Sequence, residues 1–130
     1  MTLKWNGDAA LRQLRARVAR NMAPASLYVA GQVQRKLNRG NASGADPSVP
    51  GEPPKKVTGR LQQSITSTVR SDASSIRGVI GTNVVYARRL ELGFFGTDSR
   101  GRNISQEPRP FLLNTLRESA SVVNRIIGRR

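Results

Sequence analysis

Hydrophobic residues in the first 37 positions recur with the period of an α-helix. Two groups are spaced at steps of three or four: Leu11, Leu14, Val18 and Met22, then Leu27, Ala30, Val33 and Leu37. Side chains at these steps lie on one helix face. Pro24 separates the groups, so we expect one long helix that contains the proline or two helices with Pro24 in the first turn of the second. Asp8 suits the N-cap or first turn, and Asn38-Arg39-Gly40 is typical of a helix end.

The period changes from about 3.6 to two after residue 64. Ile65, Ser67 and Val69 alternate with more polar residues, residues 71–74 are typical of a turn, and alternation resumes at Ile76. This pattern predicts an antiparallel β-hairpin. Residues 85–92 then suit a short helix, and residues 94–104 suit a turn-rich hairpin or loop.

The end of the chain has the longest apolar stripe. After Pro110, apolar residues recur at steps of four, four, three and four: Leu112, Leu116, Ala120, Val123 and Ile127. We expect one long C-terminal helix, with Pro110 in its first turn and this stripe against the core. Because strands and helices are segregated, the fold class is α+β: antiparallel hairpins packed against the N-terminal helices and the C-terminal helix.

Residues 40–57 differ in composition from the rest of the chain, being rich in proline and glycine and poor in apolar residues. They predict a long loop, either a tolerated surface insertion or a segment that orders against a neighbouring subunit. We therefore expect residues 1–130 to form a single domain that carries this loop.

The amino-acid composition excludes several kinds of chemistry for this protein. The 130 residues include no cysteine and no histidine, which excludes disulfides, Cys- or His-ligated metals and His-based catalysis. The eight acidic residues are scattered and form no catalytic pair. We expect no enzymatic activity, no cofactor and no metal. No signal-peptide or membrane-helix run is visible, so we also expect a soluble protein made inside a cell, with no membrane partner.

Positive charge points to an anionic partner. The formal net charge is +14, and residues 1–40 contribute +7 of it. The candidates for a DNA-facing or partner-facing surface are Arg12, Arg15, Arg17, Arg20, Arg88 and Arg89; the alternative is a solvated flank that keeps the protein soluble. No helix-turn-helix or RNA-recognition signature accompanies them, and aromatic residues for base stacking are sparse.

Three stretches, in this order, resemble a known family. They are PPKKVTGRLQQSI at residues 53–65, IGTNVVYARRLELG at 80–93 and PRPFL at 108–112. Together they resemble the small tail-completion, or head–tail joining, proteins of long-tailed phages. The motif residues are Thr58, Gly59, Leu61, Ser64, Tyr86, Glu91, Gly93, Arg109, Pro110 and Phe111.

Each motif residue also has a structural interpretation. Thr58 and Gly59 suit a helix cap and turn, Tyr86 and Leu90 a core-facing position, and Gly93 a helix end. We expect Glu91 to form a forked ion pair with Arg109, which would fix the loop before the last helix.

The resemblance implies a structural virion protein of the neck, assembled in the host cytoplasm. Its partners would be copies of itself in a ring, commonly a hexamer, tail terminator or tail tube proteins, and head connector, adaptor or stopper proteins. Phage DNA would pass through the channel without sequence-specific contacts. The alternatives are a tail terminator or virion-morphogenesis protein and, from another class, a small basic nucleic-acid-binding protein.

Overall fold

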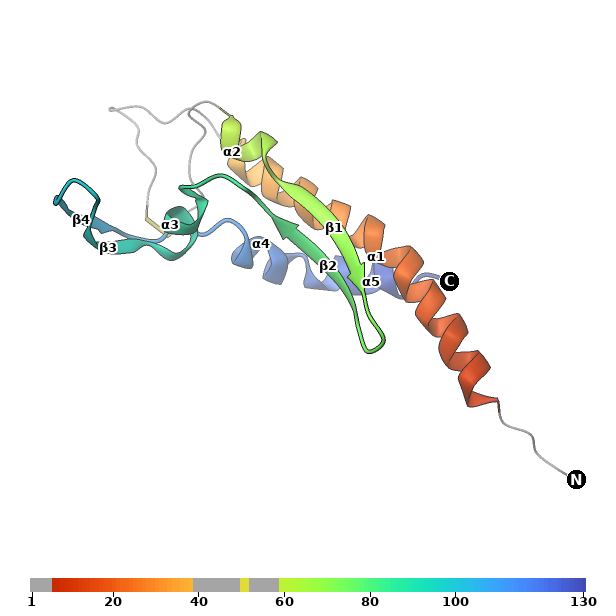
Figure 1. Ribbon diagram of the computed structural model, residues 1–130. Coiled ribbons are helices and arrows are strands. Elements are labelled where there is room, and N and C mark those ends of the chain that lie inside the picture. Colours follow the sequence, from red (N-terminus) through yellow and green to blue (C-terminus); the bar gives the residue numbers. More distant parts are fainter. Residues whose placement is uncertain (1–5, 39–49, 52–58) are drawn as a thin grey trace, which may run out of the picture.

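One long helix is the element against which most of the other elements pack. The computed structural model describes residues 6–38, 50–51 and 59–130, and within them α1 runs from Gly7 to Leu37 with Pro24 inside it (Figure 1). The Asn6 side chain accepts a hydrogen bond from the Ala9 N–H at 3.1 Å, which caps the helix, and Asp8 lies in the first turn. The single-helix alternative is therefore the correct one. The predicted loop over residues 40–57 lies outside the described residues, apart from Pro50 and Gly51.

The predicted hairpin follows the short helix α2, Arg60–Gln63. Strand β1, Thr66–Ser71, pairs antiparallel with β2, Ile76–Gly81, so that Thr66 lies opposite Gly81. The Asp72 carboxylate accepts hydrogen bonds from the N–H groups of Ser74 and Ser75, at 2.7 and 2.8 Å, and closes the turn. These bonds, chiefly the one from the Ser74 N–H, lower the pKa of Asp72 to about 2.

The second half of the chain contains a smaller hairpin between helices. Helix α3 spans Ala87–Leu92, and strands β3, Phe94–Thr97, and β4, Asn103–Gln106, form a second two-stranded sheet. Helices α4, Leu113–Glu118, and α5, Ala120–Ile127, end the chain. The α+β class and the first expected hairpin are confirmed, and of the two alternatives for residues 94–104, a hairpin or a loop, the hairpin is correct.

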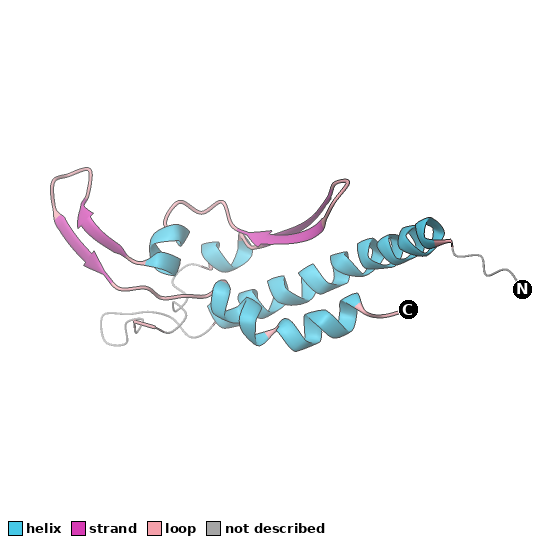
Figure 2. Ribbon diagram, turned by 90° about the horizontal axis from the view of Figure 1, so that it is seen from below, coloured by secondary structure: helices cyan, strands magenta, loops and turns pink. Residues whose placement is uncertain are grey.

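The elements pack around the C-terminal half of α1. The β1–β2 hairpin covers one side of this helix and α4–α5 cover another (Figure 2). The core contains Val33 and Leu37 of α1, Leu61 of α2, and Phe111, which is fully buried. By contrast, the N-terminal part of α1 extends beyond the rest of the molecule (Figure 1), and Leu11 and Leu14 are 63% and 46% exposed. The sequence predicted their common face correctly, but nothing in the described part of the chain covers it.

The predicted single C-terminal helix is two helices, α4 and α5, and the predicted apolar stripe is only partly buried. Helix α4 begins at Leu113 and not at Pro110. Leu112 and Val123 of the stripe pack against the core, whereas Leu116 and Ala120 are exposed, and Thr115, Ser119 and Ile126 are buried instead. The Thr115 hydroxyl donates to the Phe111 carbonyl at 2.6 Å, so it is buried without losing its hydrogen bond. A pattern of apolar residues does not reveal that a threonine and a serine are buried here.

Candidate interaction surfaces

Glu91 is the organising residue where α3 meets α4. One carboxylate oxygen accepts hydrogen bonds from the N–H groups of Phe111 and Leu112, at 2.7 and 3.0 Å, and the other accepts from the Leu113 N–H at 2.9 Å. These N–H groups belong to the start of a helix and lack intrahelical partners, and a negative charge is favoured there. Glu91 therefore caps α4, a role that replaces the predicted forked pair with Arg109.

The main chain of the Pro108–Pro110 segment fixes the same junction. The Arg109 N–H donates to the Leu90 carbonyl at 2.6 Å, next to the Glu91 cap. Gly93 ends α3 with φ of 76°, and a Cβ on it would lie 2.8 Å from the Gln106 carbonyl oxygen. Only glycine satisfies both constraints. The second and third motif stretches thus meet in space, although about twenty residues separate Glu91 from Phe111.

The first motif stretch packs in the same core as the other two, through α2. Gly59 precedes α2 with φ of 79°, a left-handed conformation, and Leu61 is buried in the core. The Ser64 hydroxyl donates to the Leu61 carbonyl at 2.6 Å and lies 2.5 Å from the Thr82 hydroxyl of the second stretch. Thr58, the predicted cap, lies outside the described residues.

Tyr86 does not occupy the predicted core position. It precedes α3 and is exposed, whereas its neighbour Ala87 is buried and Leu90 packs against the core. Val85 is 91% exposed. The turn before α3 therefore points its large side chains outward, and the small Ala87 takes the core position.

The six candidate arginines divide by their contacts. Arg15 reaches the hairpin turn, where its guanidinium donates to the Asp72 and Ala73 carbonyls. Arg89 lies over the Phe94 ring, 4.0 Å from its centroid, in a cation–π contact. Arg12 and Arg88 are exposed, and Arg17 and Arg20 line a groove on α1. Arg15 and Arg89 therefore stabilise the fold. The other four arginines, Arg12, Arg17, Arg20 and Arg88, are the ones that remain for contacts with a partner.

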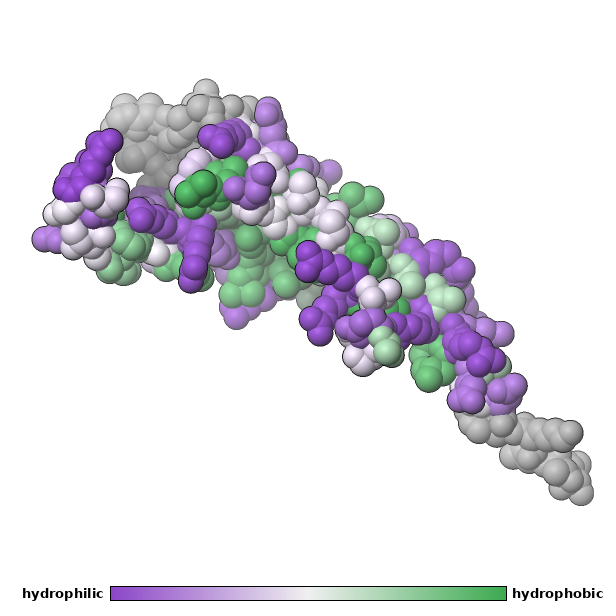
Figure 3. All heavy atoms as spheres, in the orientation of Figure 1, coloured by the Kyte–Doolittle hydropathy of each residue, from purple (hydrophilic) through white to green (hydrophobic). Residues whose placement is uncertain are grey.

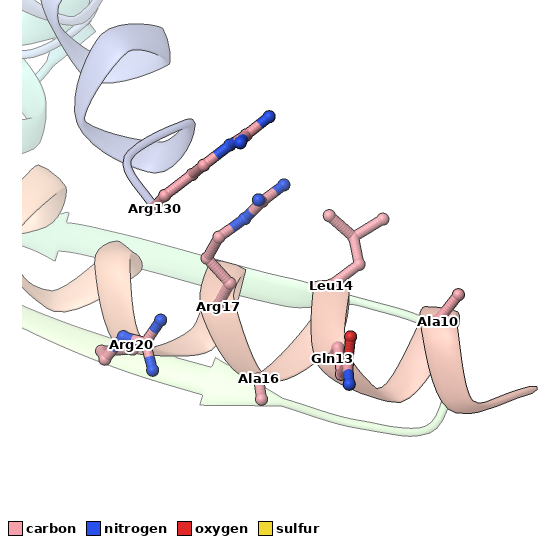
Figure 4. Close-up of a pocket in the computed structure, with 7 residues that line it drawn as sticks. All are labelled: Ala10, Gln13, Leu14, Ala16, Arg17, Arg20 and Arg130. Carbon is pink, nitrogen blue, oxygen red and sulfur yellow. The ribbon is translucent and has the colours of Figure 1, made fainter.

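The groove lies between the N-terminal half of α1 and the end of the chain. It has a volume of about 630 Å³ and is lined by Gln13, Leu14, two alanines, Arg17, Arg20 and Arg130 (Figure 4). Sequence reasoning missed Arg130 because 113 positions separate it from Arg17 and only the packing of α5 on α1 brings them together.

Exposed apolar side chains form several separate groups. One surrounds α3 and β3 (Val85, Leu92 and Phe95), a second lies on α4 (Leu113 and Leu116), and a third lies at the start of α1 (Leu11 and Leu14). Figure 3 likewise shows apolar residues at several separate places among hydrophilic ones on one face. Among the described residues, eleven large hydrophobic residues are exposed, as many as the hydrophobic residues that are buried, and three of the buried ones are alanines. Groups of exposed apolar side chains of this kind favour a protein–protein contact.

Neither metal ligation nor membrane crossing is indicated by the described residues. In residues 6–38, 50–51 and 59–130, no three Asp or Glu side chains come together in a way that would hold a metal ion. None of the helices in the same ranges is both long and apolar enough to cross a membrane.

We compared the chain with known proteins at three levels. No protein-family model, no curated protein and no solved structure matches it.

Proposed function

We propose that this protein is a structural subunit of the head–tail junction of a long-tailed phage or phage-like particle. Copies of it form a ring that joins the tail to the head connector and lets DNA pass. The observation that carries the proposal is the set of separate apolar groups exposed on α3–β3 and on α4. The three motif stretches, which resemble tail-completion proteins, specify the kind of assembly.

The geometry of the subunit supports a ring better than a simple dimer. An isologous dimer uses one self-complementary patch, whereas a closed ring uses two different patches on each subunit. Val85 and Phe95 lie at one end of the molecule and Leu116 on another element, so the subunit offers two different apolar groups. The two hairpins are separate two-stranded sheets with unpaired outer edges, and such sheets gain stability from further packing.

The charge of the subunit supports passage of DNA and late assembly. A net charge of +14 makes free subunits repel one another, so they stay apart until a tail end or neck offers a docking surface. Exposed arginines such as Arg12 and Arg88 supply contacts to phosphates without reading bases. These contacts are weak and independent of sequence, which suits a channel through which DNA moves.

Particle assembly without this protein is the decisive experiment. We expect full heads and separate tails that fail to join, and we expect electron microscopy of complemented particles to show a ring of this protein at the neck. Normal infectious particles from the deletion would refute the proposal. Complemented particles without the ring at the neck would support a tail terminator or a virion-morphogenesis role instead.

Complementation with surface variants tests the ring contact itself. Val85→Asp and Phe95→Asp place a charge in the α3–β3 group, and we expect folded protein that fails to restore joining. Ser99→Asp, an equal charge change on the exposed turn of the β3–β4 hairpin, is the control and restores joining. If the Val85 and Phe95 variants also restore normal particles, the α3–β3 group is not a ring contact.

A second candidate function, non-specific nucleic-acid binding, is favoured by one pair of residues. Arg70 and Arg77 lie directly opposite each other on β1 and β2, and both are exposed. Like charges in this position repel, and a polyanion across them would relieve the repulsion. Submicromolar binding of duplex DNA by the isolated monomer, with a steep salt dependence, would favour this function over the ring.

A further inference from the structure

The groove on α1 combines like charges with an apolar wall. In Figure 4 the side chains of Arg17 and Arg130 extend side by side in the same direction, and Leu14 projects from α1 next to them. Arg20 lines the same groove, and no acidic residue is among its lining residues. Figure 4 shows Arg20 apart from this pair, so two adjacent guanidinium groups and a third farther along the groove favour a negatively charged occupant.

The fold holds this arrangement in place. The Asn21 side-chain amide donates to the Ile127 carbonyl at 3.0 Å and to the Arg129 carbonyl at 2.6 Å. These bonds fasten the end of α5 to α1 and position Arg130 beside Arg17. The Arg17 Nε atom is buried and has no hydrogen-bond partner among the described residues. A negatively charged occupant of the groove would balance the charge of the arginines that line it.

The apolar wall identifies the chemistry of the occupant. Leu14 is about half exposed in the groove, and Leu11 continues the same apolar group toward the start of the helix. Phosphate groups of a nucleic acid offer nothing apolar to these side chains, and nucleic-acid binding depends mainly on charge. An amphipathic protein segment offers carboxylates to the arginines and apolar side chains to the leucines in one surface.

The acidic residues of this chain make a second copy a poor occupant. Within the described residues, four of the six carboxylates are already bound in the monomer: Asp72, Glu91, Asp98 and Glu118. Asp8 and Glu107 remain, one on α1 and one after β4, and Asp46 and Glu52 lie outside the described residues. The described part of a copy therefore presents two isolated carboxylates, not an acidic surface.

We propose that the groove formed by Arg17, Arg20 and Arg130 with Leu14 is a docking site for an acidic amphipathic segment of a different protein. The arginines bind its carboxylates, and Leu11 and Leu14 bind its apolar face. The inference does not depend on the proposed ring, because it uses a different group of side chains from the α3–β3 and α4 groups.

Binding of synthetic probes to the full chain tests the proposal. The probe is a fluorescein-labelled 18-residue peptide with leucines at helical steps of three and four and glutamates elsewhere; a scrambled peptide of the same composition and a 20-base-pair DNA duplex are the comparisons. We expect the amphipathic peptide to bind at least about tenfold tighter than the scrambled one, because only it aligns both kinds of contact.

Matched variants separate the groove from bulk charge. We expect Leu14→Gln to weaken peptide binding about fivefold and to leave DNA binding within about twofold, while Leu27→Gln, at an exposed leucine of the same helix, changes neither. Arg17→Gln should weaken peptide binding more than Arg35→Gln, an equal charge change elsewhere on α1. Circular dichroism of each variant verifies folding.

Three results would overturn the proposal. Equal binding of the amphipathic and scrambled peptides means that bulk charge alone is responsible. Displacement of the peptide by DNA, combined with no effect of Leu14→Gln, assigns the groove to nucleic acid. Self-association in sedimentation experiments that Leu14→Gln abolishes assigns it to a second copy.

Discussion

Glu91→Ala tests whether one carboxylate organises the start of α4. The change removes the acceptors of three main-chain N–H groups, at residues 111–113. The N–H groups of Phe111 and Leu112 donate partly buried hydrogen bonds to Glu91. Each buried donor left without an acceptor costs roughly 1–3 kcal/mol. The Leu113 N–H is exposed and becomes accessible to solvent when the carboxylate is removed, so its loss is limited to the charge effect at the helix start, about 0.3–1 kcal/mol. We expect a loss of about 3 kcal/mol in the free energy of unfolding.

Urea denaturation followed by circular dichroism measures this loss. With a denaturant slope of about 2 kcal/mol/M, the midpoint should fall by roughly 1.5 M. Glu91→Gln keeps a neutral acceptor and should lose about 1–2 kcal/mol, because uncharged hydrogen bonds are weaker. Glu107→Ala, an exposed acid nearby, should change stability by less than about 0.5 kcal/mol. A loss below about 1 kcal/mol for Glu91→Ala, or equal losses for the alanine and glutamine variants, would refute the capping role.

Three further changes test the packing and the hairpin turn. Gly78→Ala should cost about 1–3 kcal/mol in chemical denaturation, because its Cβ would lie 2.0 Å from the Ser26 hydroxyl oxygen, and adding Ser26→Ala should restore part of the loss; an additive pair would contradict the contact. Phe111→Ala should cost about 3–5 kcal/mol because the ring is fully buried, and a loss below about 1 kcal/mol would contradict its core position. The Asp72 carboxyl should titrate near pH 2 by NMR; because its folded pKa is lowered, its stabilisation is present above about pH 4 and disappears as the pH falls toward 2, and a midpoint near 3.8 would contradict the turn hydrogen bonds.

The local pattern of the sequence predicted most of the elements. Three features could be predicted because each depends only on residues close together in the chain. They are the helical period of α1, the two-residue period of the first hairpin and the glycine that ends α3. The pattern placed the start of the last helix at Pro110, whereas the helix begins at Leu113 under the Glu91 cap. That boundary depends on a residue about twenty positions away, which local rules do not include.

The candidate site was predicted less completely for the same reason. Arg17 and Arg20 were singled out by their place in a basic helix, but Arg130 was not, and Arg15 and Arg89 proved to be engaged within the fold. A count of arginines does not distinguish a cation held by a carbonyl or an aromatic ring from one that faces solvent. Only the packing of the β1–β2 hairpin and of α5 against α1, and the place of Phe94 under Arg89, make that distinction.

The sequence by itself determined the α+β class, the strongly positive charge and the absence of cysteine and histidine, because these follow from residue identity and local period. The tertiary structure alone decided which apolar faces are covered. Leu14 and Val33 both fit the helical spacing of α1, yet Val33 is fully buried and Leu14 is 46% exposed, because core residues of other elements, such as Leu61 and Phe111, pack with Val33 and not with Leu14. Whether a helix face is buried depends on the elements that pack against it. Those elements are positioned by contacts between residues far apart in the chain.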